Sequence, residues 1–205
     1  MAVLAEARVG HLDSLGGYEI TSQSPVGARF GPDERKVLAW SRNPWSDIDR
    51  VGDHRLPHGR YVAGTTTTAV GELRVVAICI PWHMCDVRHD SKDRKPWEQH
   101  LRWLEYFGST VLQPSPIPVL IAGDFNQRIP RSSGARRDVA EALAAALVGF
   151  EVATAGVLTG CDRQGVNHIA VDDRLCATSV NGWPHDAGGT RMSDHDGIVA
   201  DFCRV

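Results

Sequence analysis

The sequence of 205 residues predicts an α+β fold, in which many short strands are covered by a few helices. Two observations lead to this prediction. Short runs rich in apolar or β-branched residues recur along the chain, and turn residues such as Gly, Pro and Asp separate them. Only two segments, near residues 97–110 and 137–147, have the apolar spacing of an amphipathic helix.

The strand predictions rest on local patterns. The β-branched run of threonines at 65–68 suits a pleated sheet, and Gly71-Glu72 marks the turn of a hairpin between residues 60–70 and 73–80. The apolar run at 117–122 is typical of a buried strand. The other expected strands are residues 3–6, 18–21, 37–41, a segment near Glu151, 167–171, 174–180 and 197–202.

Both helix predictions come with a stripe of inward-facing residues. Pro96 precedes the first helix, in which Leu101, Leu104 and Phe107 share one face. The second helix is rich in alanine and stops before Gly149. Its inward residues are Val139, Leu143 and Leu147.

Composition is that of a globular domain, and we expect residues 1–205 to form one domain. The formal net charge of −3 argues against a broadly basic nucleic-acid surface, although scattered arginines such as Arg29 and Arg60 remain candidate phosphate contacts. Five cysteines, an odd number, form no evident disulfide framework. His83, Cys85 and His89 suggest a soft-metal site, which we consider the weaker interpretation because a fourth ligand is lacking.

Three short motifs carry the chemistry. Gly123-Asp124-Phe125-Asn126 follows the strand at 117–122 and offers a carboxylate and an amide where the sheet opens to solvent. Ser193-Asp194-His195 precedes the last strand, and His83 follows the strand at 73–80. Taken singly, these motifs are also explained by turns and by a packed histidine.

In this order, the motifs resemble those of the endonuclease/exonuclease/phosphatase superfamily, the fold of pancreatic deoxyribonuclease and exonuclease III. The resemblance runs over residues 3–202. It implies a two-sheet β-sandwich with helices on its outer faces. It does not choose between nucleic acids, sugar or inositol phosphates and phospholipids as substrates.

The resemblance also implies roles for individual residues. His195 looks like the general base that activates water, and His83 like a second catalytic imidazole. Asp124 looks like the group that orients the nucleophile or helps to bind metal, and Asn126 like an amide that orients the phosphate. The metal ligands would be Glu6 and Asp194, which favour Mg²⁺ or Mn²⁺ because their oxygens are hard.

Two departures from the family pattern matter. The family has a strand ending in a metal-associated Asn before the strand that Glu6 ends, so we expect this domain to lack the first strand and to be incomplete at its N-terminus. The family also usually has Asp where Asn167 precedes His168. We expect Asn167 to orient His195 without stabilising its imidazolium by charge, unless Asp162, Asp172 or Asp173 substitutes.

These features lead to two functional hypotheses. The first is a divalent-metal-dependent phosphoesterase that hydrolyses a phosphodiester or phosphomonoester, with DNA and RNA among its candidate substrates. The alternative is a catalytically weak or inactive phosphate-binding domain of the same fold. No secretory signal or long apolar span is present in the sequence, so we expect a cytoplasmic protein without a membrane segment.

Overall fold

The computed structural model describes residues 1–25, 31–87, 95–111 and 113–205, and within them it has the mixed α+β character that the sequence predicts. The largest sheet has six strands in the order β4-β5-β6-β7-β9-β8. β6 and β7 are parallel, and the other neighbours are antiparallel. The strands are β4 Trp45–Asp49, β5 Tyr61–Thr68, β6 Gly71–Cys79, β7 Val119–Asp124, β8 Phe150–Val152 and β9 Asn167–Asp172.

Smaller sheets accompany the large one. A three-stranded sheet has the order β1-β3-β2, and two hairpin-like pairs are formed by β10 with β13 and by β11 with β12. Their strands are β1 Ala2–Arg8, β2 Tyr18–Thr21, β3 Glu34–Ser41, β10 Leu175–Trp183, β11 Asp186–Ala187, β12 Thr190–Arg191 and β13 Gly197–Arg204. A short 3-10 helix, η1 Asp13–Leu15, follows β1.

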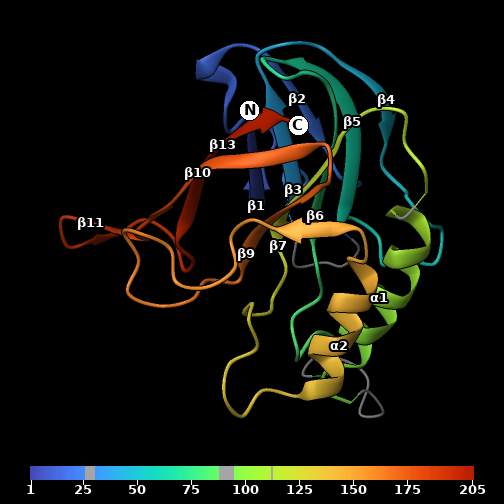
Figure 1. Ribbon diagram of the computed structural model, residues 1–205, viewed down its shortest axis with the longest axis vertical. Helices are drawn as coiled ribbons and strands as arrows, with labels where there is room; N and C mark the ends of the chain where they lie inside the picture. The colour runs from blue at the N-terminus through green and yellow to red at the C-terminus, as the bar shows by residue number, and fades with distance from the viewer. Residues whose placement is uncertain (26–30, 88–94, 112) are drawn as a thin grey trace.

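Two helices pack together beside the large sheet (Figure 1). They are α1 Glu98–Val111 and α2 Arg137–Ala146, and each begins and ends within one residue of its predicted bounds. Val139, Leu143 and Leu147 are buried as predicted. No helix in the described part of the chain has the length and hydrophobicity needed to cross a bilayer.

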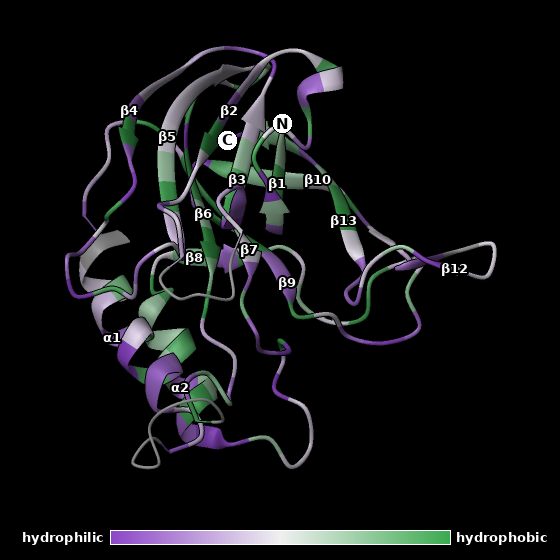
Figure 2. Ribbon diagram, turned by 180° about the vertical axis from the view of Figure 1, so that it is seen from behind, coloured by the Kyte–Doolittle hydropathy of each residue, from purple (hydrophilic) through white to green (hydrophobic). Residues whose placement is uncertain are grey.

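Strand alternation divides the core between the two faces of the large sheet. On β6, Val76 and Ile78 pack with Trp103 and Phe107 of α1, whereas Ala77 packs with residues of β2 and β3. Since successive side chains of a strand point to opposite faces, the helices and the three-stranded sheet cover opposite faces of the large sheet. In Figure 2, the apolar colour of β6 agrees with this position in the interior.

One contact between β6 and β7 leaves no room for a side chain. Gly123 pairs with Ile78 across these parallel strands and has a φ of 142°. A Cβ atom at Gly123 would lie 1.9 Å from the carbonyl oxygen of Ile78. Glycine is required here both by conformation and by the close approach of two backbones.

We therefore expect Gly123→Ala to lower the free energy of unfolding by about 3 kcal/mol or more. Gly134→Ala is the matched control, because Gly134 also has a positive φ, of 81°, but nothing lies within 4 Å of its added Cβ. The control should cost only about 1 kcal/mol. Urea unfolding followed by circular dichroism measures both, and equal losses would show that the contact with Ile78 relaxes easily.

Candidate active site

The predicted site residues gather where β7 ends and β9 begins. Asp124, the last residue of β7, pairs with Asn167, the first residue of β9. Beside them lies a cavity of about 1590 Å³. Six of the seven residues predicted from the sequence line it, namely Glu6, Asp124, Asn126, Asn167, Asp194 and His195.

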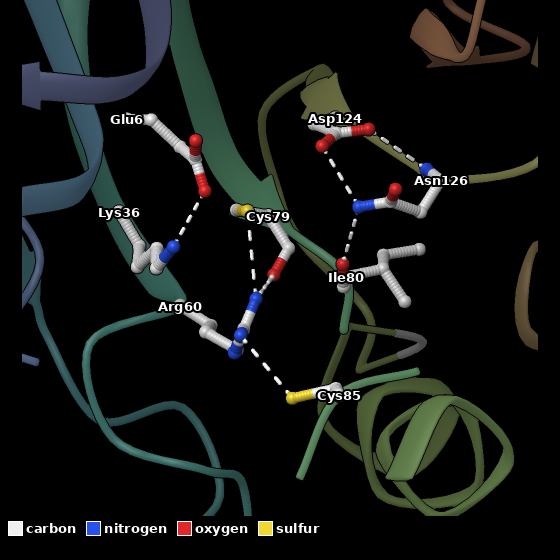
Figure 3. Close-up of polar contacts among 8 residues, drawn as sticks. All are labelled: Glu6, Lys36, Arg60, Cys79, Ile80, Cys85, Asp124 and Asn126. Atoms are coloured by element: carbon white, nitrogen blue, oxygen red, sulfur yellow. Dashed lines mark hydrogen bonds and ion pairs between the residues drawn. The ribbon is translucent and has the colours of Figure 1, made fainter. Parts of the chain in front are cut away.

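The Asp124 carboxylate is buried and held by its neighbour Asn126. The backbone N–H of Asn126 donates to Oδ1 of Asp124 at 2.9 Å, and Nδ2 of Asn126 donates to Oδ2 at 2.8 Å. The same Nδ2 also donates to the carbonyl oxygen of Ile80 at 2.8 Å. Both hydrogens of the Asn126 amide are thus engaged, so in this arrangement the amide orients Asp124 (Figure 3).

Burial raises the pKa of Asp124, and the nearby charge of Glu6 acts in the same direction. The hydrogen bond from Asn126 and the charges of His195 and Arg60 oppose this rise. The charges of Glu6, His195 and Arg60 therefore all act on the Asp124 carboxyl group. A carboxylate with a raised pKa beside a histidine in a cavity is typical of a functional site.

Asn167 contacts the backbone of the segment that carries His195. Its Nδ2 donates to the carbonyl oxygen of Asp196 at 2.9 Å. Asn167 therefore positions the residues around His195 through the main chain. Asp172, a predicted substitute carboxylate, accepts instead from Arg174 and from the backbone N–H of Val119.

The sequence interpretation missed a second histidine at the cavity. His185 lines it and places its Nδ1 2.5 Å from Oδ1 of Asp196, while the backbone N–H of His185 donates to the same oxygen at 2.9 Å. Burial acts to raise the pKa of Asp196, but the hydrogen bonds from His185 and Cys161 lower it overall. His185 and Asp196 are brought together by the chain that includes β11 and β12 between them. Their spacing in the sequence therefore does not reveal the pair.

His83 is the one predicted site residue that is not among the described residues lining the cavity, although its neighbours Trp82 and Met84 are. Its ring centroid is 5.1 Å from that of Trp82 and 5.5 Å from that of Trp97. Just before it, the Pro81 carbonyl accepts a hydrogen bond of 2.7 Å from Nδ1 of the buried His100. His100 thus anchors the chain from which Trp82 and His83 project.

Two cations, Lys36 and Arg60, line the cavity together with its acidic residues. Nζ of Lys36 on β3 donates to Oε1 of Glu6 at 2.5 Å. Arg60 donates to the carbonyl oxygen of Cys79 at 3.2 Å, and its guanidinium also lies near the sulfurs of Cys79 and Cys85. Figure 3 shows Lys36 reaching Glu6, and Arg60 reaching Cys79 and Cys85. Of the predicted arginines, Arg29 lies outside the described residues, as does His89 of the soft-metal alternative.

The donor chemistry around Asp124 fits Mg²⁺ or Mn²⁺. Among the described residues, no three His, Cys, Asp or Glu side chains are grouped closely enough to hold an ion by themselves. Mg²⁺ usually needs less, because it takes one or two carboxylates and keeps its other positions for water and substrate phosphate. Glu6 and Asp124 both line the cavity, so oxygen donors of the kind that Mg²⁺ prefers are present there.

Comparison with solved structures identifies the fold. The 3′ phosphatase NExo from Neisseria, bound to a product DNA hairpin, has a TM-score of 0.70 and 15% identity, over 98% of this chain and 87% of its own. An AP endonuclease from Archaeoglobus fulgidus has a TM-score of 0.66 and 14% identity, over 98% of this chain and 87% of its own. An endonuclease/exonuclease/phosphatase from Beutenbergia cavernae has a TM-score of 0.62 and 13% identity, over 98% of this chain and 62% of its own.

No protein-family model matches the chain, and no curated protein matches its sequence. The predicted resemblance to the endonuclease/exonuclease/phosphatase superfamily is therefore confirmed as a likeness of fold over nearly the whole chain.

The buried His100 generates a prediction about pH. Burial lowers the pKa of His100 to about 4 from 6.5. Between these values the unfolded chain binds more protons than the folded chain, so stability falls as the pH falls from about 6.5 to about 4. The contribution of His100 to this loss is about 3 kcal/mol.

Urea unfolding at several pH values tests this contribution of His100 to the pH dependence of stability. We expect His100→Asn to flatten the dependence of the unfolding free energy on pH in this window, whatever its effect at pH 7. His54→Asn, which replaces a histidine whose side chain is 87% exposed, is the control against which the flattening is measured. An unchanged slope in the His100 variant would mean that this imidazole is not kept neutral by burial.

Proposed function

We propose that this chain is a divalent-metal-dependent phosphoesterase in which His195 activates the attacking water. The observation that carries the proposal is the convergence of Asp124, Asp194 and His195 with Glu6 on one cavity. The likeness of fold to a 3′ phosphatase and to an AP endonuclease supports the reaction class.

Each residue has a role that its position allows. The imidazole of His195 accepts the proton of water, which is the role of a general base. Asp124, held by Asn126, orients the water or the metal. Glu6, Asp194 and Asp124 are the proposed metal ligands, and a bound ion would neutralise charge on the phosphoryl oxygens.

We propose further that the substrate carries a flat ring beside its phosphate, as a nucleotide does. Two tryptophans at the cavity, Trp82 and Trp183, are 40% and 62% exposed. Exposed aromatic rings beside a phosphate site provide stacking surfaces for bases. The cations Lys36 and Arg60 supply local positive charge that the net charge of −3 conceals.

We expect His195→Ala to lower phosphoester turnover at least about 100-fold, the usual effect of a general base. Hydrolysis of a 3′-phosphorylated oligonucleotide and of an internal phosphodiester, each with Mg²⁺ or Mn²⁺, measures this. His54→Ala is the control, because it removes an imidazole outside the cavity lining. The melting temperature should change little in either variant.

Full activity of His195→Ala would remove His195 as the base. If the unaltered chain binds the phosphorylated oligonucleotide but does not hydrolyse it, the alternative of an inactive phosphate-binding domain is correct. The contact of Asn167 with the backbone, which leaves His195 without a charged partner from that position, is the observation in favour of this alternative.

We also propose that the small sheets form one layer of a two-sheet sandwich and that a further strand fits between β1 and β13. Among the described residues, β1 pairs with β3 alone and β13 with β10 alone. The lining of the cavity includes Ala2–Glu6 of β1 and Gly197–Ala200 of β13. The apolar Leu120 and Ala122 of β7 also line it, and Val3 of β1 and Phe202 of β13 pack against the core cluster that contains them. Two strand edges without a second neighbour, beside apolar residues, match an added β-strand.

A fusion experiment tests this proposal. A segment of about seven alternating Val and Thr residues, joined by a Gly/Ser linker ahead of Met1, should raise the melting temperature by at least about 3 °C. The control carries prolines at two alternate positions of that segment, because proline cannot donate to a sheet ladder. Equal melting temperatures for the two fusions would contradict the proposal.

A further inference from the structure

Lys36 and Glu6 form an ion pair at the cavity. The distance between Nζ and Oε1 is 2.5 Å, and the Lys36 side chain is only 15% exposed, against 61% for Glu6. A lysine is rarely so covered unless its ammonium has a partner. Lys36 reaches the carboxylate from β3, the strand that pairs with β1.

The backbone around Glu6 is adapted to this position. Glu6 has a φ of 53°, which is uncommon for a residue with a side chain. The ladder between β1 and β3 pairs Ala5 with Val37 and Ala7 with Arg35, and it skips Glu6. Such a local departure from regular pairing re-aims a side chain and is common next to active sites.

We infer that Lys36 is the resident cation of the Glu6 carboxylate and that a divalent ion binds Glu6 only by displacing it. This inference rests on the proposed function, because it treats Glu6 as a metal ligand. The ammonium and the ion compete for the same oxygen, since Oε1 already accepts the charged hydrogen bond from Lys36. Lys36 thereby weakens metal binding and sets the ion concentration at which the site fills.

Arg60 provides a matched comparison within the same cavity. It is also a cation that lines the cavity, but its hydrogen bonds go to the carbonyl oxygen of Cys79 and to two sulfurs. Removing Arg60 changes the local charge without freeing Glu6. Comparing a variant of Lys36 with a variant of Arg60 therefore separates direct competition for Glu6 from a general effect of positive charge.

The test measures binding of Mn²⁺ by electron paramagnetic resonance and of Mg²⁺ by calorimetry, without substrate. We expect Lys36→Met to bind Mn²⁺ about fivefold more tightly, the upper range for a partly exposed ion pair. Arg60→Met should change the affinity less than twofold. Lys95→Met, which removes an exposed lysine outside the cavity lining, should not change it.

The same comparison in a Glu6→Gln background should give no gain from Lys36→Met. If neither Glu6→Gln chain binds detectably, Glu6 is a required ligand and the comparison of Lys36→Met with Arg60→Met decides. Equal gains in those two variants, or no gain in Lys36→Met, would overturn the inference while leaving metal binding intact. Absence of binding in every variant would overturn the metal-dependent function as well.

Folding is checked by the melting temperature of each variant, and Lys36→Gln serves as a second substitution that keeps a polar side chain. If both Lys36 variants unfold, the ammonium is needed by the fold and is not displaceable, which also overturns the inference. Binding by Lys36→Met where the unaltered chain shows none would support it.

Discussion

The site depends on the contact between the last residues of the parallel strands β6 and β7 and the residues that follow them. Their parallel pairing ends with Cys79 opposite Asp124. Beyond it, the N–H of Ile80 donates to the carbonyl oxygen of Asp124 at 2.8 Å, and the amide of Asn126 returns a bond to the carbonyl of Ile80. Main-chain groups that would otherwise be buried without partners thus satisfy each other. This arrangement fixes Asp124 before any ligand is present.

Charge neutralisation is the second constraint on the cavity. Three carboxylates there, those of Glu6, Asp124 and Asp194, would repel one another if they were left alone. Lys36 forms an ion pair with Glu6, and the charges of His195 and Arg60 act on Asp124. The cavity is therefore lined by both carboxylates and cations, so groups of either charge meet an opposite charge there.

The sequence was sufficient for the elements whose signal is local. Apolar spacing located α1 and α2 to within a residue, and β-branched runs located β5 and β6. Trp103, which is fully buried in α1, was missed because the stripe of Leu104 and Phe107 already accounted for one face. The motifs identified six residues that line one cavity, because strand ends are where a sheet presents its side chains to solvent.

The parts that the sequence could not supply depend on long-range pairing. Lys36 sits in an ordinary strand pattern, and only the register of β1 against β3 places it opposite Glu6. The pairing of His185 with Asp196 likewise depends on the path of the chain between β10 and β13. Neither residue has a neighbour in sequence that would reveal its partner, so periodicity alone says nothing of them.

Asn167 occupies a position of the family motif in sequence, but its side chain makes a different contact from the one that the motif predicts. The family pattern directs attention to the ring of His195, whereas the structure gives Asn167 the carbonyl of Asp196 as its partner. An amide suits that partner because it donates, while an ionised carboxylate offers only acceptors and would face the carbonyl oxygen unfavourably. The side chain of Asp196 is meanwhile bound by His185, so both ends of this residue are held. The position of His195 therefore follows from two hydrogen-bonded supports on its neighbour, and the asparagine is chemically matched to the contact it makes.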